Sequence, residues 1–330
     1  MIYITGDTHC DYVRFSKKRM TKQGMELTDQ DYMIVCGDFG LCWAKDGTFA
    51  YHCKNFEQKP YTILWVQGNH ENYDMIEEYP IEEWHGGKVR HIIRDKVILL
   101  ERGQVFEIEG KTFFTFGGAS SHDIQGGVLD RKDPDFYEKR RKALNMELPY
   151  RIIHESWWPQ ELPTEEEMQE GLRNLARHDD HVDYVITHCC ATTIQKQLGE
   201  ESGHKYESDI LTDYFQELEQ RIKYQHWYFG HYHEDRCVDE KHSLLYRAII
   251  SLEGDHNLNE TPILGKPRYQ WGDEVQFSWG ADCIKTGTVQ IVDAYGTFEQ
   301  NLEPSYDILV EEDNCLYKHI CESEILGKGI

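Results

Sequence analysis

Five short segments of the chain carry carboxylate, amide and imidazole side chains, the groups that bind divalent metal ions. The segments are Asp7-Thr8-His9, Gly37-Asp38, Gly68-Asn69-His70-Glu71, Thr187-His188 and Gly230-His231-Tyr232-His233. In an extended segment, residues i and i+2 point to the same side, so both ends of Asp-x-His or His-x-His can face one ion. Asp-x-His and Gly-Asp alone are typical of ordinary turns, whereas Gly-Asn-His-Glu and Gly-His-Tyr-His are rarer. The joint occurrence of all five segments predicts a metal centre. Oxygen and nitrogen ligands without a thiolate suit Mn, Fe, Zn, Co or Ni.

The first three of these segments follow predicted strands. Short apolar runs at Ile2–Thr5, Tyr32–Cys36 and Tyr61–Val66 are typical of buried strands. The stretches between them are long enough for crossover helices, which predicts right-handed β-α-β units and a largely buried sheet. Polar residues at the carboxyl ends of such strands meet at one edge of the sheet, where α/β proteins bind ligands.

The rest of the chain changes character near residue 260. Before that point the pattern predicts a hairpin (Gln104–Ile108 with Lys111–Phe116), a helix from a capping box at Thr164 and Glu167 to Arg177, a helix over Ser208–Lys223, and strands at Val182–Thr187, Trp227–Phe229 and Leu244–Ile250. A linker is expected over residues 255–267. Beyond it only strands are expected, at Glu274–Trp279, Gly287–Asp293, Tyr306–Glu311 and Leu316–Ile320, which suggests a small β-barrel. The expected domains are residues 1–258 and 259–330.

The five segments, in this order, resemble the calcineurin-like metallophosphoesterase superfamily, over about residues 1–255. The resemblance implies a four-layer α/β/β/α sandwich with a dinuclear metal centre. It implies that Asp7, His9 and His233 hold one ion and that Asn69, His188 and His231 hold the second. Asp38 would bridge both ions, and His70 would be the catalytic residue that binds neither. The C-terminal strands resemble an SH3-like barrel in pattern only.

Two divalent ions, with manganese as the first candidate, would give this centre its chemistry. Ions about 4 Å apart neutralise a phosphoryl group and lower the pKa of a shared water, whose hydroxide can attack phosphorus in line. Protonated His70 could then stabilise or protonate the leaving oxygen. The expected activity is hydrolysis of a phosphomonoester or phosphodiester of a small metabolite or nucleotide.

One departure from the family pattern concerns the second segment. In many relatives it continues as Gly-Asp-x-x-Asp-Arg, where the Asp orients the catalytic His and the Arg binds phosphate. Here Leu41 and Cys42 occupy those positions. Neither side chain can do that work, which argues against a protein Ser/Thr phosphatase and leaves open what supports His70.

The missing cation could come from a long excursion over residues 119–163. Arg131 and Arg151 are candidate phosphate ligands, since a guanidinium matches phosphate oxygens, and Trp157 is a candidate substrate contact. The alternatives are a solvated basic helix around Lys139–Lys142 and tryptophans that only fill the core. Gly117–Ser120 and Ser156–Glu161 resemble a pair of segments, Gly-Gly-Ala-Ser and Ser-Trp-Trp-x-x-Glu, found in bacterial members of the superfamily.

The composition narrows the class of protein and its partners. The 330 residues include 35 Lys and Arg and 59 Asp and Glu, for a net charge of −24. An acidic surface repels nucleic acid, which argues against an extended nucleic-acid ligand. No apolar run approaches the roughly 18 residues of a membrane span, and the ten cysteines suggest reduced thiols in the cytoplasm.

Three rival functions stay open at this point. A nuclease acting on nucleic-acid ends would need a basic track, a protein phosphatase lacks support at Leu41 and Cys42, and a non-catalytic metal-binding scaffold would be expected to lack ligands. The C-terminal barrel could bind a protein partner, mediate self-association or only pack.

Overall fold

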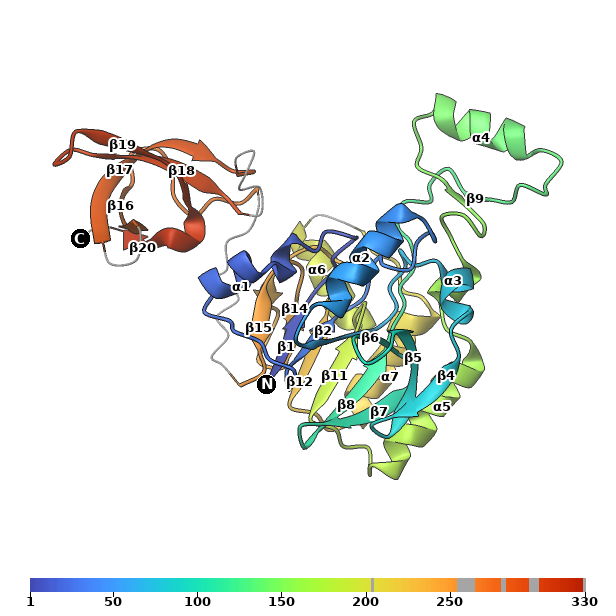
Figure 1. Cartoon of the computed structure of the whole chain (residues 1–330). Coiled ribbons are helices and arrows are strands. Elements are labelled where there is room, and N and C mark those ends of the chain that lie inside the picture. The colour runs from blue at the N-terminus through green and yellow to red at the C-terminus, as the bar shows by residue number, and fades with distance from the viewer. Residues whose placement is uncertain (203–204, 254–264, 280–282, 297–302, 329–330) are drawn as a thin grey trace. The chain divides into compact units, whose positions relative to one another are not determined.

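The computed structural model describes residues 1–202, 205–253, 265–279, 283–296 and 303–328. The chain forms two compact units, Met1–His256 and Asn257–Ile330 (Figure 1). None of the helices in the described ranges has both the length and the apolar character that crossing a membrane requires.

Two sheets build the first unit. The seven-stranded sheet has the order β15 (Ile249–Ser251), β1 (Ile2–Thr5), β2 (Tyr32–Val35), β3 (Thr62–Trp65), β6 (Val97–Leu100), β5 (Gly87–Ile93) and β4 (Ile81–Trp84). The six-stranded sheet has the order β13 (Arg236–Cys237), β14 (His242–Leu244), β12 (His226–Phe229), β11 (Tyr184–Thr187), β8 (Lys111–Phe116) and β7 (Gln104–Ile108). Strands β1, β2 and β3 are parallel to one another, and so are β8, β11 and β12.

Helices cover one face of each sheet. The seven-stranded sheet packs against α1 (Lys17–Lys22), α2 (Gly47–Glu57) and α3 (Tyr73–Glu77), and the six-stranded sheet packs against α5 (Glu165–Arg177), α6 (Thr192–Ser202) and α7 (Ile210–Arg221). Every residue of β1, β6 and β11 is buried, so the other face of each sheet is covered as well. Continuous apolar strands are what burial on both faces requires. The predicted α/β architecture with a separate small all-β unit is confirmed.

The expected elements occur close to their predicted bounds, with one error. The capping box at Thr164 and Glu167 opens α5, and the hairpin has the predicted bounds. The single strand expected over Leu244–Ile250 is wrong, because it is interrupted between β14 and β15. The backbone N–H groups of Tyr246 and Ala248 donate to the buried carboxylate of Asp235 and are therefore not available to a sheet.

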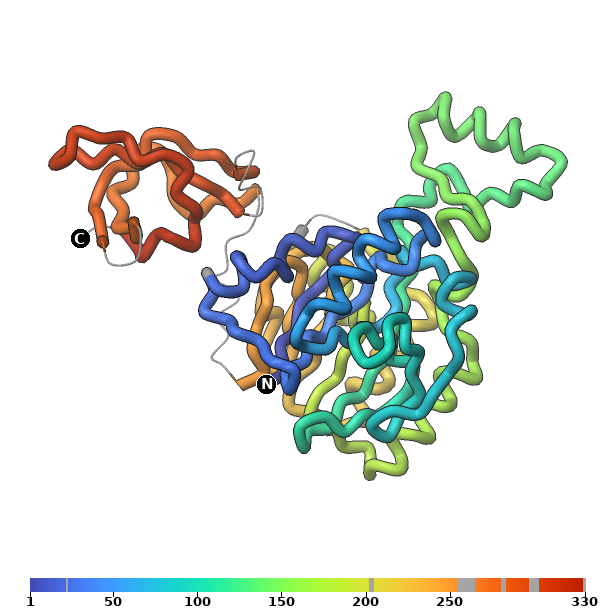
Figure 2. Tube along the Cα trace, viewed as in Figure 1, coloured from blue at the N-terminus to red at the C-terminus, as the bar shows by residue number. Residues whose placement is uncertain are grey.

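The expected excursion over residues 119–163 has structure of its own. It contains β9 (Val128–Leu129), α4 (Phe136–Asn145), β10 (Arg151–Ile152) and the 3₁₀ helix η2 (Pro159–Glu161). Strands β9 and β10 pair in parallel. We call residues 124–150 the arm, since Figure 2 shows this segment projecting from the sheets with α4 near its end.

The second unit is a five-stranded antiparallel sheet around its own apolar core. Its strand order is β19 (Cys315–Cys321), β18 (Ser305–Val310), β17 (Cys283–Asp293), β16 (Glu274–Trp279) and β20 (Ile325–Lys328), and a short 3₁₀ helix (Glu322–Glu324) precedes β20. Strand β20 was not among the expected strands. The SH3-like barrel stays a prediction, and most of the expected linker over 255–267 lies outside the described residues.

Candidate metal centre

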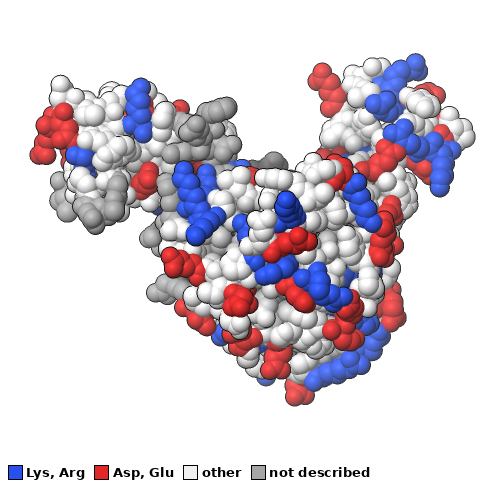
Figure 3. All heavy atoms as spheres, viewed as in Figure 1, with Lys and Arg blue, Asp and Glu red and all other residues white. Residues whose placement is uncertain are grey.

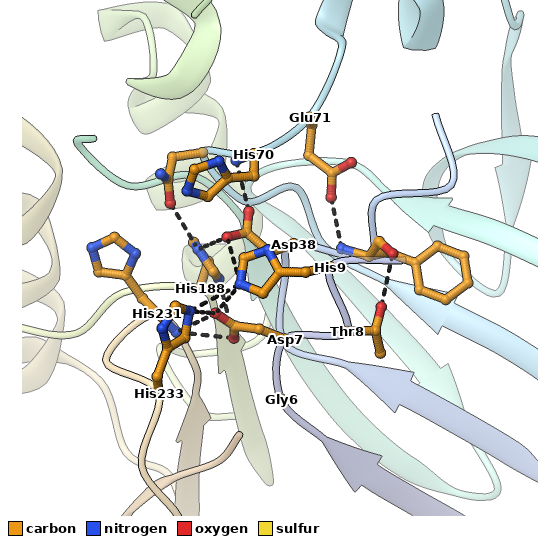
Figure 4. A network of polar contacts seen from close by, with 12 residues as sticks. Gly6, Asp7, Thr8, His9, Asp38, His70, Glu71, His188, His231 and His233 are labelled. Carbon is orange, nitrogen blue, oxygen red and sulfur yellow. Dashed lines mark hydrogen bonds and ion pairs between the residues drawn. The ribbon is translucent and has the colours of Figure 1, made fainter. Parts of the chain in front are cut away.

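All five predicted segments follow strands whose carboxyl ends point in one direction within their sheet. Asp7, Asp38 and Asn69 follow β1, β2 and β3, whereas His188 and His231 follow β11 and β12. Figure 4 shows Asp38, His9, His188, His231 and His233 gathered around Asp7. The two sheets therefore bring together side chains that are more than 200 residues apart in the sequence.

The first ligand group consists of Asp7, His9 and His233. Their ligand atoms all lie within 4.8 Å of one another, as binding of one ion requires. His233 Nε2 lies 3.2 Å from Asp7 Oδ2 and 2.9 Å from His9 Nε2. Asp7 is fully buried, whereas both imidazoles are exposed, so the group is open to solvent on one side.

The second ligand group consists of Asp7, Asp38 and His188, whose ligand atoms again lie within 4.8 Å of one another. His188 Nε2 lies 3.5 Å from Asp38 Oδ2 and 3.1 Å from the Asn69 amide oxygen. The other nitrogen, Nδ1, lies 2.8 Å from the Cys36 carbonyl oxygen, which holds the ring in place. The structure thus places Asp38 and Asn69 beside His188 as predicted, and it adds Asp7 to this group.

His231 is held differently from the other candidate ligands. Its backbone N–H donates to Asp7 Oδ1 over 3.0 Å, while its Nε2 lies 2.8 Å from Nε2 of His122. The ring centroids of His231 and His188 are 5.0 Å apart. His122 was not among the predicted site residues.

The crowding of acids and imidazoles shifts several pKa values. Burial opposes protonation of His188, but the Asp38 and Asp7 carboxylates outweigh it and raise its pKa to about 9. Burial alone would raise the pKa of Asp38, yet His188 and the other imidazoles hold it well below its usual range. The pKa of His231 falls far below its ordinary value, first through burial and then through His188. The site is therefore built to hold Asp38 as a carboxylate.

The backbone is strained at several candidate ligands. His9 (φ 45°), Asp38 (φ 47°), His231 (φ 72°) and His233 (φ 53°) all have left-handed conformations. Non-glycine residues adopt such conformations at a cost of about 1 kcal/mol or more, and they persist only where the surroundings enforce them. The surroundings therefore fix the backbone of these four candidate ligands.

His70 lies between the ligand groups and the base of the arm. Its backbone N–H donates to Asp38 Oδ1 over 2.7 Å, and its ring is 5.3 Å from that of His9. Arg151 Nη2 lies 3.2 Å from His70 Nδ1, and the same guanidinium donates to both carboxylate oxygens of Asp123, over 2.9 and 2.5 Å. Burial lowers the pKa of His70, and Arg151 acts in the same direction.

These contacts show which groups lie beside His70, a question that the sequence left open because Leu41 and Cys42 replace the family's Asp and Arg. Leu41 and Cys42 are buried in the apolar core of the seven-stranded sheet, as their side chains suggest. Arg151 and Asp123 lie next to the imidazole instead. Arg151 therefore lies at the candidate site, and phosphate binding by Arg151 stays a prediction.

The other two candidate substrate residues lie farther from this constellation. Arg131 is exposed and forms an ion pair with Glu155, with Nη2 and Oε2 2.8 Å apart. Trp157 is half-buried, and its carbonyl accepts a hydrogen bond from the His154 N–H. Trp158 is a core residue, because its ring is 1% exposed and its indole N–H donates to Asp74.

Two buried glutamates near the centre lack a full set of partners. Glu71 accepts the Phe39 N–H with Oε1, and Glu161 accepts the Ser121 hydroxyl with Oε2 over 2.7 Å. The second oxygen of each has no hydrogen-bond partner within the described part of the chain. Burial raises the pKa of Glu71 well above its usual range and that of Glu161 to about 8.

Ser121, His122 and Asp123 were not among the predicted site residues, and Glu161 was named only as the end of a motif, although a signal was present for the first three. The predicted strand Lys111–Phe116 is followed by Gly-Gly-Ala and then by polar residues, a pattern similar to that of the other segments. The motif Gly117–Ser120 ends one residue before the side chains that reach the site.

One family of known proteins matches most of the first unit. Residues 1–235 match the family model described as calcineurin-like phosphoesterase. No curated protein matches. The matching solved structures include the crystal structure of phosphopantetheinyl hydrolase (PptH) from Mycobacterium tuberculosis, at 14% identity and a TM-score of 0.35, over 74% of this chain and 89% of that chain. A likeness of that strength transfers no substrate.

Proposed function

Because the chain belongs to the calcineurin-like phosphoesterase family, we propose that it hydrolyses a phosphomonoester or phosphodiester of a small metabolite or nucleotide with the help of two divalent ions. Manganese is the first candidate, and Fe, Zn, Co or Ni would suit the same ligands. The observation that carries the proposal is the meeting of Asp7, Asp38, His9, His188 and His233 at the ends of two sheets.

The residues present fit such a centre. Asp7, His9 and His233 would hold one ion, Asn69, His188 and His231 the second, and Asp38 both. When bound, the two ions would neutralise phosphoryl oxygens and bring the pKa of a water near neutrality. The buried carboxylates of Asp7 and Asp38 support this assignment, since buried anions need compensating charge.

His70 and Arg151 are the groups that would act on the substrate. The backbone N–H of His70 donates to Asp38 at the centre, whereas a ring nitrogen of His70 faces Arg151. A phosphate oxygen entering between them would accept hydrogen bonds from the guanidinium, while the imidazole would donate a proton to the leaving oxygen. Asp123 would keep the guanidinium in this orientation through its two hydrogen bonds.

The surroundings support a small substrate. A cavity of about 910 Å³ is lined by Cys10, Tyr12, Tyr51 and Phe56 among others, but by none of the candidate ligands and neither by His70 nor by Arg151, so it is a neighbour of the site and not the site itself. On the face drawn in Figure 3, basic and acidic side chains are interspersed, which favours a small substrate over a nucleic-acid strand on that face.

Kinetics with esters of different leaving groups test the proposal. Mn-loaded His70→Ala should keep its metals and lose about 10²–10⁴-fold in kcat on alkyl phosphates, with a smaller loss on p-nitrophenyl esters, which scarcely need an acid. Arg151→Ala should raise KM or lower kcat/KM with unchanged metal content, whereas Arg141→Ala, an exposed arginine of α4, serves as the control. Equal losses on both kinds of ester would refute the role of His70, and an absence of metal binding in the unmodified protein would refute the function.

A further inference from the structure

The segment after β8 and the segment containing η2 meet beside Asn69. Asn69 Nδ2 donates to Ser121 Oγ over 3.2 Å, and Ser121 Oγ donates to Glu161 Oε2 over 2.7 Å. All three side chains are at least nine-tenths buried. The sequence motifs Gly117–Ser120 and Ser156–Glu161 belong to these two segments, and the proposed chemistry assigns no role to Ser121 or Glu161.

The direction of these hydrogen bonds follows from the groups involved. Glu161 Oε2 also accepts the backbone N–H of Ser121, over 3.3 Å, so this oxygen acts as an acceptor. Ser121 must then donate its only hydroxyl proton to Glu161 and can offer Asn69 only a lone pair. Asn69 meets that lone pair with its NH₂ group, which turns its carbonyl oxygen the other way, toward His188.

The same two segments are fastened to one another by backbone contacts. The buried guanidinium of Arg102 donates to the carbonyl oxygens of Gly117 and Gln160, over 2.8 and 2.6 Å. A Cβ atom on Gly118 would lie 2.5 Å from the Glu161 carbonyl oxygen, and one on Gly117 would lie 2.4 Å from the Gln67 nitrogen. Only glycine therefore permits this approach, which explains the Gly-Gly pair that precedes Ser121.

We propose that Ser121 and Glu161 are positioning residues that fix the Asn69 amide with its oxygen toward the second ion. The inference rests on the proposed function, because it concerns the ion that Asn69 would hold. We call the hydrogen bonds from Asn69 to Ser121 and from Ser121 to Glu161 the relay. Without the relay, the amide could rotate and present its NH₂ group, which cannot bind a cation. Groups that orient a metal ligand typically change metal affinity by about 10- to 100-fold when they are removed.

Metal titration of the full-length protein tests the relay directly. Manganese content and affinity are measured by elemental analysis and electron paramagnetic resonance. Ser121→Ala and Glu161→Ala should each weaken binding of one ion of the pair by about 10- to 100-fold, with the other ion retained. Ser120→Ala is the matched control, since the Ser120 hydroxyl contacts Asp209 and not Asn69. Ser120→Ala should bind both ions as the unmodified protein does.

Two further variants separate positioning from general damage. Glu161→Gln keeps an acceptor oxygen, so it should retain metal affinity that Glu161→Ala loses; equal losses would show that charge and not hydrogen-bond direction matters, and would overturn the relay. Ser121→Ala should cause no further loss in an Asn69→Ala background, because the relay acts only through that amide. An additive loss would also overturn it.

The failure of the relay can be told apart from the failure of the function. If the unmodified protein binds two ions and hydrolyses esters while Ser121→Ala binds both ions equally well, only the relay is wrong. If the unmodified protein binds no divalent ion, the function and the relay both fall.

Discussion

Glu161 in the first unit and Glu322 in the second are both 1% exposed, yet their surroundings differ. Glu322 accepts hydrogen bonds with both oxygens, from the Arg268 N–H over 2.8 Å, from the Arg268 guanidinium over 2.9 Å and from the Tyr306 hydroxyl. The carboxyl group of Glu161 uses one oxygen, and among the described residues no guanidinium is bonded to it. A buried acid with a complete set of partners stabilises its own unit, whereas one without them invites a functional explanation.

The largest effect is expected where the acids of the first unit meet the ions. Asp38→Asn removes the carboxylate that contacts both His9 and His188, at 3.7 and 3.5 Å. A bound ion stabilises a phosphoryl transition state by several kcal/mol and 1.36 kcal/mol is a factor of ten, so turnover should fall by at least about 10³-fold. Elemental analysis should show reduced metal content. Normal rates with both ions bound would show that the acids of the first unit serve another purpose.

A loss of stability and not of activity is expected from Glu322→Gln. The change removes charge-assisted hydrogen bonds from a buried site, which should cost about 1–3 kcal/mol of unfolding free energy in the second unit. Hydrogen exchange of β18 and β19 would report it. Glu311→Gln, on an exposed residue of the same unit, is the control. Metal content should be unchanged. A loss of metal in Glu322→Gln would contradict the view that Glu322 stabilises only the second unit.

The metal-free protein should show the neutral character of Glu161 in its pH dependence. Its pKa of about 8 lies above the ordinary value near 4.3, so between these limits the folded state binds more protons than the unfolded state. The contribution of Glu161 to the free energy of unfolding should therefore fall as pH rises from about 4.5 to about 8. Glu161→Gln should reduce this slope in denaturant titrations with chelator present. The exposed Glu155→Gln should leave it as it was.

The smallest effect is expected from removing the second unit. The first unit, which ends at His256, contains every candidate ligand, the last of which is His233. A chain shortened to residues 1–256 should therefore bind the same number of ions and hydrolyse chromogenic esters at unchanged rates. Loss of metal on truncation would show that the two units share structure that the site needs. A selective loss with a natural substrate would support recognition by the C-terminal sheet.

Local pattern predicted the parts of this site that are local in sequence. Each candidate ligand segment directly follows a short apolar strand, so strand pattern and residue spacing together indicated Asp7, Asp38 and His188 as candidate ligands. The groups beside His70 were harder to predict, because Arg151 is 81 residues away in the sequence and contacts the His70 ring only once the chain has returned from the arm. Glu161 and Ser121 are 40 residues apart in the sequence, and Arg102 helps to hold their segments together. No periodic pattern in the sequence predicts such a contact.

Two of the strands missing from the prediction have a similar explanation, whereas β6 is a continuous apolar run that local pattern could have predicted. Strand β4 alternates exposed and half-buried residues at the edge of its sheet, where weak pairing leaves little apolar pattern. Strand β14 is a central strand of only three residues, and the loop after it is bound by Asp235. Tertiary hydrogen bonds, and not local preference, decided those boundaries.

The left-handed backbone at His9, Asp38, His231 and His233 has an evolutionary consequence. Glycine would relieve the strain at each of these positions, so selection for stability alone would favour replacing them. Each replacement would also delete a candidate ligand. Stability and catalysis therefore place opposite demands on these four positions. Attempts to engineer a more thermostable variant should keep these four residues and change other positions.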